Sequence, residues 1–112
     1  MVRGECLELR SLRGSKGREQ QGRRYAVVVQ SDHIRGLGTV MVAPTSASVV
    51  PTSFRPAIEM GGQLTRVLVE QTIALDERRL GRSVGRLSAA EMTEVERALS
   101  TVLGLQPRHL RG

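Results

Sequence analysis

Basic and hydroxyl side chains flank two apolar runs of the sequence, and their types suit the binding of a phosphate group. Arg23 and Arg24 come directly before one β-branched run, and Thr45 and Ser46 directly follow the next apolar run. If the two runs form neighbouring antiparallel strands, the start of one lies near the end of the other. A fixed guanidinium beside hydroxyl groups can bind phosphate through charge-assisted hydrogen bonds. The alternative is structural, because Thr after Pro commonly caps a turn and the arginines could be ordinary surface charge.

The sequence lacks the usual motifs for metal binding, disulfide formation and nucleotide-phosphate binding by a glycine-rich loop. His33 and His109 are far apart, and Cys6 is the only cysteine, so neither a metal site nor an internal disulfide is expected. No glycine-rich phosphate-binding motif occurs. We therefore expect no metal and no cofactor.

The composition favours a polyanionic partner. The chain has 112 residues, enough for one domain, and a net charge of +6. Lys16 is the only lysine, and arginine presents a planar donor fork that fits phosphate. Nucleic acid is the first candidate, although arginine enrichment in a GC-rich genome would give the same composition. No long apolar stretch and no signal peptide are present, so we expect a cytoplasmic protein without a membrane anchor.

The apolar pattern predicts a mainly β fold. Short strands are expected at residues 3–9, 25–30, 39–43, 54–60, 66–71 and 82–87. Pro44 is expected to stop the third strand, and Pro56 marks residues 54–60 as an edge strand. Residues 10–23 form a polar, basic loop, and residues 76–81 a single helical turn from Asp76 to Gly81.

A helix is predicted at residues 88–103. Ser88 and Glu91 have capping-box spacing, and Gly104 ends the helix. Its expected core-facing stripe consists of Met92, Val95, Leu99 and Val102. The fold class is therefore mainly β with α, a small antiparallel barrel or curled sheet with a C-terminal amphipathic helix packed on it. Residues 1–105 form its single domain, and residues 106–112 are expected to be a frayed tail.

Three segments in order resemble the MazF/PemK family of toxin endoribonucleases: "GREQQGRRYAVVVQSD", "TVMVAPTSAS" and "RLGRSVGRLS…VERALSTVLGL". The resemblance implies an SH3-like barrel of the CcdB/PemK type and a homodimer. It also implies metal-independent cleavage of single-stranded RNA at preferred sequences. The ribose 2′-hydroxyl attacks the neighbouring phosphate, leaving a cyclic phosphate and a 5′-hydroxyl. A cognate MazE-like antitoxin with a disordered tail is the implied protein partner, and the tail blocks the RNA groove.

The resemblance also implies roles for individual residues. Arg24 matches the catalytic arginine of the family and Thr45 its catalytic threonine. Contacts with RNA are expected from Arg18, Glu19, Gln20, Arg23 and Ser46. The chain departs from the family pattern where Tyr25 replaces a proline and where Ile73 replaces an arginine.

Two alternative functions remain open at this level. A CcdB-like toxin would poison gyrase through a helix end without any catalytic site. A plain basic barrel would bind nucleic acid through its charge alone. The match at Arg24 and Thr45 favours the ribonuclease.

Overall fold

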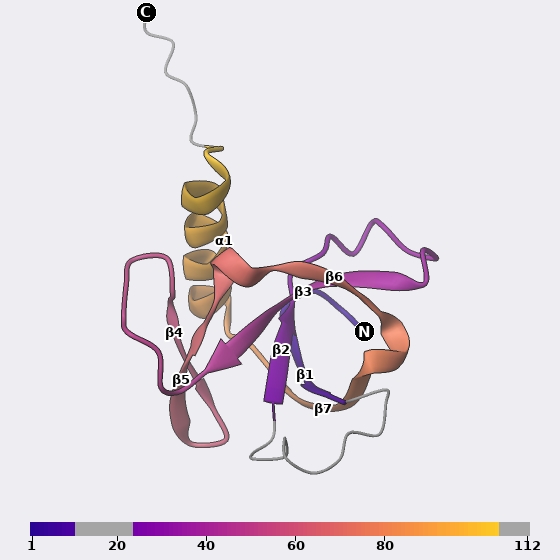
Figure 1. Ribbon diagram of the computed structural model, residues 1–112, viewed down its shortest axis with the longest axis horizontal. Coiled ribbons are helices and arrows are strands. Elements are labelled where there is room, and N and C mark those ends of the chain that lie inside the picture. Colours follow the sequence, from indigo (N-terminus) through magenta and orange to yellow (C-terminus); the bar gives the residue numbers. More distant parts are fainter. Residues whose placement is uncertain (11–23, 106–112) are drawn as a thin grey trace, which may run out of the picture.

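The computed structural model describes residues 1–10 and 24–105. In this part of the chain, an antiparallel sheet is followed by one α-helix (Figure 1). The strands are β1 (Glu5–Leu9), β2 (Arg24–Val28), β3 (Thr39–Ser46), β4 (Ala57–Met60), β5 (Gln63–Val67), β6 (Ile73–Asp76) and β7 (Leu80–Arg86), and the helix is α1 (Ala89–Leu103). The strand order is β4-β5-β3-β2-β1-β7, and β6 pairs with β3 beyond the end of β5. The predicted small antiparallel barrel with a C-terminal helix is confirmed as a half-barrel.

Both faces of the central strands are buried. Val27 belongs to a core cluster that includes Val95 of α1. Its neighbour Val28 points to the opposite face and packs with Leu7 and Leu80 inside the curl of the sheet. Figure 1 shows α1 on the side of β4 and β5, while β1, β2, β3, β6 and β7 curl around the second cluster. Burial on both faces explains the uninterrupted valine run in β2.

The start of α1 is fixed by the predicted capping box. The Ser88 hydroxyl accepts a hydrogen bond from the Glu91 N–H at 3.1 Å, and the Glu91 carboxylate accepts one from the Ser88 N–H at 2.9 Å. The second oxygen of Glu91 accepts the N–H of Glu59 at 2.9 Å, which ties the helix to the edge strand β4. Gly104 ends the helix at φ 69°, a conformation that favours glycine.

The core-facing stripe of α1 is shorter than predicted. Val95 is fully buried, Met92 and Leu99 pack partly against the same core, and Ala98 is buried as well. Val102 was expected in this stripe but is 37 % exposed. The last turn of α1 extends beyond the strands, so the sheet offers no surface to cover Val102 (Figure 1).

The prediction that Pro44 stops the third strand is wrong, because β3 continues to Ser46. Pro44 pairs with Ala26 of β2, and its carbonyl accepts the N–H of Leu68 on the other edge. The pairing of β3 with β6 ends at Val42 on that edge, so the missing N–H of Pro44 falls where β3 changes partners from β6 to β5.

The predicted strand at residues 66–71 is also wrong in its second half. β5 ends at Val67, and a 3₁₀ turn, η2 (Val69–Gln71), follows. Val67, Leu68 and Val69 are all buried, which a one-sided alternating strand does not allow. The short strand β6 that follows η2 was not predicted.

Smaller differences concern the ends of the remaining elements. Residues 54–56 lie outside β4, and β7 begins at Leu80, two residues before the predicted start. The predicted turn after Asp76 is confirmed as the 3₁₀ turn η3 (Glu77–Arg79), with the Asp76 side chain accepting the N–H of Arg78. Gly81 does not end it, because Leu80 takes that place and Gly81 belongs to β7. The predicted tail at 106–112 lies outside the described residues.

Candidate functional site

The pairing of β2 with β3 brings the start of β2, at Arg24, near the end of β3, at Thr45 and Ser46. Ala26 lies opposite Pro44 in this antiparallel pair. The pairing with β2 ends there, and Thr45 and Ser46 continue β3 by pairing with Val67 and Arg66 of β5. The Thr45 hydroxyl donates a long hydrogen bond of 3.4 Å to the Tyr25 carbonyl. This contact holds Thr45 beside Tyr25 at the start of β2, one residue from Arg24 in the chain.

Arg24 is exposed at the end of the sheet where other arginines gather. Leu9 of β1 pairs with Arg24 on one side and with Leu80 on the other. Arg10 directly follows β1, and Arg79 directly precedes β7. The Arg10 N–H donates to the Arg79 carbonyl at 2.8 Å, and the Arg79 guanidinium donates to the Arg10 carbonyl at 2.8 Å. Within the described residues, no ion pair or hydrogen bond engages the Arg24 guanidinium. Its charge is therefore free to meet an anion that the neighbouring cations also attract.

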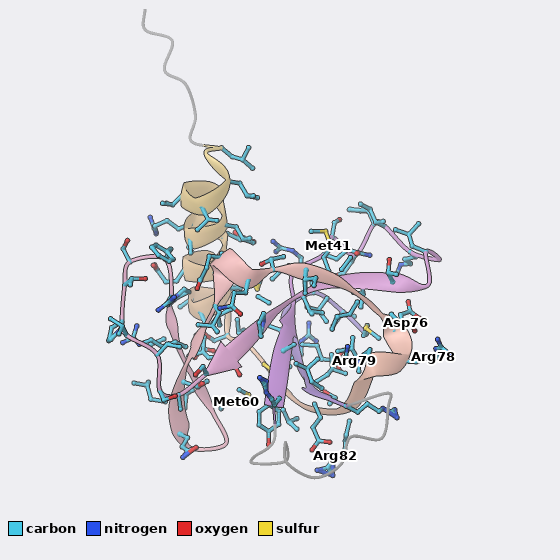
Figure 2. All side chains as sticks on the ribbon, viewed as in Figure 1. Met41, Met60, Asp76, Arg78, Arg79 and Arg82 are labelled. Atoms are coloured by element: carbon cyan, nitrogen blue, oxygen red, sulfur yellow. The ribbon has the colours of Figure 1, made fainter. Side chains whose placement is uncertain are left out.

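Sequence reasoning did not single out Arg79 as part of this site. Figure 2 shows Arg79 near η3 and Arg82 below β7. Arg82 lies 3.7 Å from the Glu8 carboxylate. Arg79 directly precedes Leu80, which shares its β1 partner Leu9 with Arg24, and no local pattern in the sequence reveals that topology.

A pocket of about 470 Å³ opens beside Thr45. One wall comes from the β2–β3 pair and the other from the β4–β5 hairpin and β7. The lining includes Tyr25, Thr45, Ser46, Met60, Gln63, Thr65 and Val84. Figure 2 shows Met60 between the β4–β5 hairpin and the start of β2. Gln63 and Thr65 were also missed from the sequence, although the alternating pattern of residues 63–67 could have placed them on one face.

Several predicted RNA contacts cannot be placed in this site. Arg18, Glu19, Gln20 and Arg23 lie outside the described residues. Ser46 is placed, and its hydroxyl accepts the N–H of Ser48 at 3.3 Å. The loop that follows β3, which contains Ser48, therefore starts at the candidate site.

Cys6 is buried in the core away from these groups. Burial, and then the nearby carboxylates of Glu91 and Glu5, raise the pKa of its thiol to about 11. The thiol therefore stays protonated at neutral pH and is a poor nucleophile. Among residues 1–10 and 24–105, no three His, Cys, Asp or Glu side chains lie close enough to hold a metal ion. Over the same residues, no helix has the length and apolarity needed to cross a membrane.

The fold and the site together define a small antiparallel half-barrel with an arginine-rich strand end and an adjoining pocket. Residues 3–103 match the model of the PemK-like, MazF-like toxins of type II toxin–antitoxin systems. The chain belongs to this family.

Two curated relatives come from Mycobacterium tuberculosis strain H37Rv. A protein named as a toxin is 38% identical over 107 residues, covering 94% of this chain and 99% of its own. Endoribonuclease MazF9 is 30% identical over 116 residues, covering 94% and 98%. A solved mycobacterial endoribonuclease in complex with its cognate antitoxin has the same fold, with a TM-score of 0.74, 19% identity and coverage of 96% and 99%.

Proposed function

We propose that this toxin cleaves single-stranded RNA without a metal ion, and that Arg24 and Thr45 are its catalytic residues. The observation that supports this most directly is the register of β2 and β3. It places the start of β2, where Arg24 is exposed, near the end of β3, where Thr45 and Ser46 line a pocket. The toxin family and the endoribonuclease relative supply the reaction class.

The reaction requires stabilisation of negative charge on phosphorus. The ribose 2′-hydroxyl loses its proton and attacks the adjacent phosphorus atom. The bond to the 5′-oxygen of the next nucleotide then breaks, and this oxygen takes up a proton. The products are a 2′,3′-cyclic phosphate and a 5′-hydroxyl, and neither water nor a metal ion is needed for this step.

Arg24 suits the transition state of this reaction. The phosphorane carries more charge on its oxygens than the phosphate diester does, so a preorganised charged donor stabilises it preferentially. Thr45 can add a second donor, because its contact with the Tyr25 carbonyl is long and a closer phosphoryl oxygen can replace it. Arg10 and Arg79 contribute attraction for the RNA backbone rather than chemistry.

A cognate antitoxin is the protein partner in this proposal. Type II systems pair the toxin with a protein inhibitor, and the net charge of +6 favours an acidic segment. Such a segment would lie across the arginine-rich strand end and exclude RNA. The active form is a homodimer, since Val50, Leu64 and Ile73 leave apolar surface exposed on a single chain.

Incubating the purified protein with single-stranded RNA in EDTA tests this function. We expect fragments that end in a cyclic phosphate and begin with a 5′-hydroxyl. An otherwise identical RNA with one 2′-deoxynucleotide before the cleaved phosphate should stay intact at that position, because it lacks the attacking group. Cleavage only after addition of Mg²⁺, or cleavage at the deoxynucleotide, would contradict the mechanism.

A further inference from the structure

We propose that the pocket beside Thr45 takes one nucleobase of the RNA, and that Gln63 and Thr65 read its hydrogen-bonding edge. This inference rests on the proposed function, because it assigns a specificity-determining role within the same site. The pocket shares Thr45 and Ser46 with the candidate catalytic centre. A base that enters it would therefore lie beside Thr45, a candidate catalytic residue.

Thr65 is the observation that points to a ligand. It is 8 % exposed and is the one polar residue among the buried residues that the structure describes. Within the same residues, no hydrogen bond satisfies its hydroxyl, although it lines the pocket. A hydroxyl that opens onto the pocket and has no partner among these residues is available to donate to or accept from a ligand. A ligand that enters the pocket can supply the missing hydrogen bond.

Gln63 stands on the same face of β5 as Thr65. Side chains two residues apart in a strand point to the same side, and both residues line the pocket. Gln63 is exposed, and no hydrogen bond within the described residues engages its amide. Its side chain therefore offers a free donor and a free acceptor, the pair that binds a base edge in a bidentate manner.

The remaining walls suit a flat heterocycle. Tyr25 is one of only two aromatic residues in the chain and lies in this lining, where Met60 and Val84 provide apolar contact. Aromatic side chains support bases by stacking. A volume of about 470 Å³ falls within the range of roughly 300–1,000 Å³ typical of small-ligand pockets. Polar groups at one end and apolar walls elsewhere thus fit a base better than a bare phosphate.

Binding of oligonucleotides that cannot be cleaved tests the pocket separately from catalysis. The probes are fluorescein-labelled seven-residue 2′-O-methyl oligouridylates in which one position at a time is changed to A, C or G. The wild-type protein should prefer certain bases at one position. Gln63→Leu and Thr65→Val should reduce that preference by roughly 5- to 100-fold at that position alone. Thr93→Val serves as the matched control, because it makes the same change as Thr65→Val at an exposed position of α1.

Gln63→Glu tests whether this position can be given a new base preference. A carboxylate only accepts hydrogen bonds, so it should select the base edge with two adjacent donors, which only guanine presents at N1 and N2. We expect the preferred base at the affected position to shift toward guanine. Because Gln63 is exposed, these variants should fold even if Thr65→Val does not.

The outcomes separate this inference from the proposed function. If the wild-type protein binds every oligonucleotide equally, or if Gln63→Leu weakens all of them alike, no base is read here and the inference is overturned. Loss of preference in Gln63→Leu with RNA cleavage retained supports both proposals. A protein that shows a preference dependent on Gln63 but does not cut RNA supports the pocket and contradicts the ribonuclease assignment.

Discussion

Replacing Glu91 with alanine removes three stabilising contributions at the start of α1. The carboxylate accepts the Ser88 N–H and also the N–H of Glu59, both at 2.9 Å. The second contact matters because β4 is the edge strand of the sheet, where an outward N–H has no neighbouring strand to pair with. The third contribution is the favourable interaction of a negative charge with the helix N-terminus.

The expected loss follows from these contacts. Loss of a helix cap costs about 0.5–2 kcal/mol, and a hydrogen bond to a charged group contributes about 1.5–3 kcal/mol. Because Glu91 is only half-buried, water can take over part of the hydrogen bonding that the carboxylate provides. We therefore expect Glu91→Ala to lower the free energy of unfolding by about 2 kcal/mol. Glu91→Gln keeps an acceptor and loses the charge, so it should cost about half as much.

Urea denaturation followed by circular dichroism measures this difference. Glu94→Ala is the matched control, since Glu94 lies on the exposed face of α1 and pairs with Arg97 at 3.3 Å. It should change the free energy of unfolding by less than about 0.5 kcal/mol. Equal decreases in the free energy of unfolding for Glu91→Ala and Glu94→Ala would refute the proposal that Glu91 caps α1 and binds the backbone of β4.

Three further outcomes are expected. Val95→Ala should lower the free energy of unfolding by about 2–3 kcal/mol because Val95 is fully buried, whereas Val102→Ala should cost under about 0.5 kcal/mol; similar urea midpoints would contradict the packing of α1. Hydrogen bonds from Arg55 lower the pKa of Glu70 below 4.5, so its stabilising contribution is present at neutral pH and is lost as the pH falls below about 4.5. Glu70→Gln should therefore be less stable than wild type at pH 7 and lose less stability on acidification, and parallel pH profiles would argue against this pair. Sedimentation at micromolar concentration should give about twice the 12.3 kDa of one chain, and a mass of one chain would contradict the homodimer.

Local signals in the sequence predicted several elements correctly. The capping box at Ser88 and Glu91 and the glycine at 104 set the ends of α1, because these features act through neighbouring residues. The two apolar runs that became β2 and β3 were also found, together with their antiparallel pairing.

The features that were missed depend on contacts between distant segments. β3 passes through Pro44 only because its partner changes at that point, and no residue near Pro44 indicates this change. Arg79 reaches the site through the pairing of β1 with β7, and Thr65 through the fold of β5 against β3. Such pairings are set by tertiary packing, which residue types and short spacing do not specify.

The most direct test of the account is the single-turnover rate of RNA cleavage by Arg24→Ala in EDTA at saturating RNA. Arg97→Ala is the matched control, because it removes the same charge from the exposed side of α1. A preorganised charged donor in the transition state contributes about 3–4 kcal/mol, so Arg24→Ala should cut RNA roughly 10²- to 10³-fold more slowly while most of its RNA affinity remains. Equal cleavage rates for Arg24→Ala and Arg97→Ala would show that Arg24 is surface charge and would contradict the proposed catalytic site.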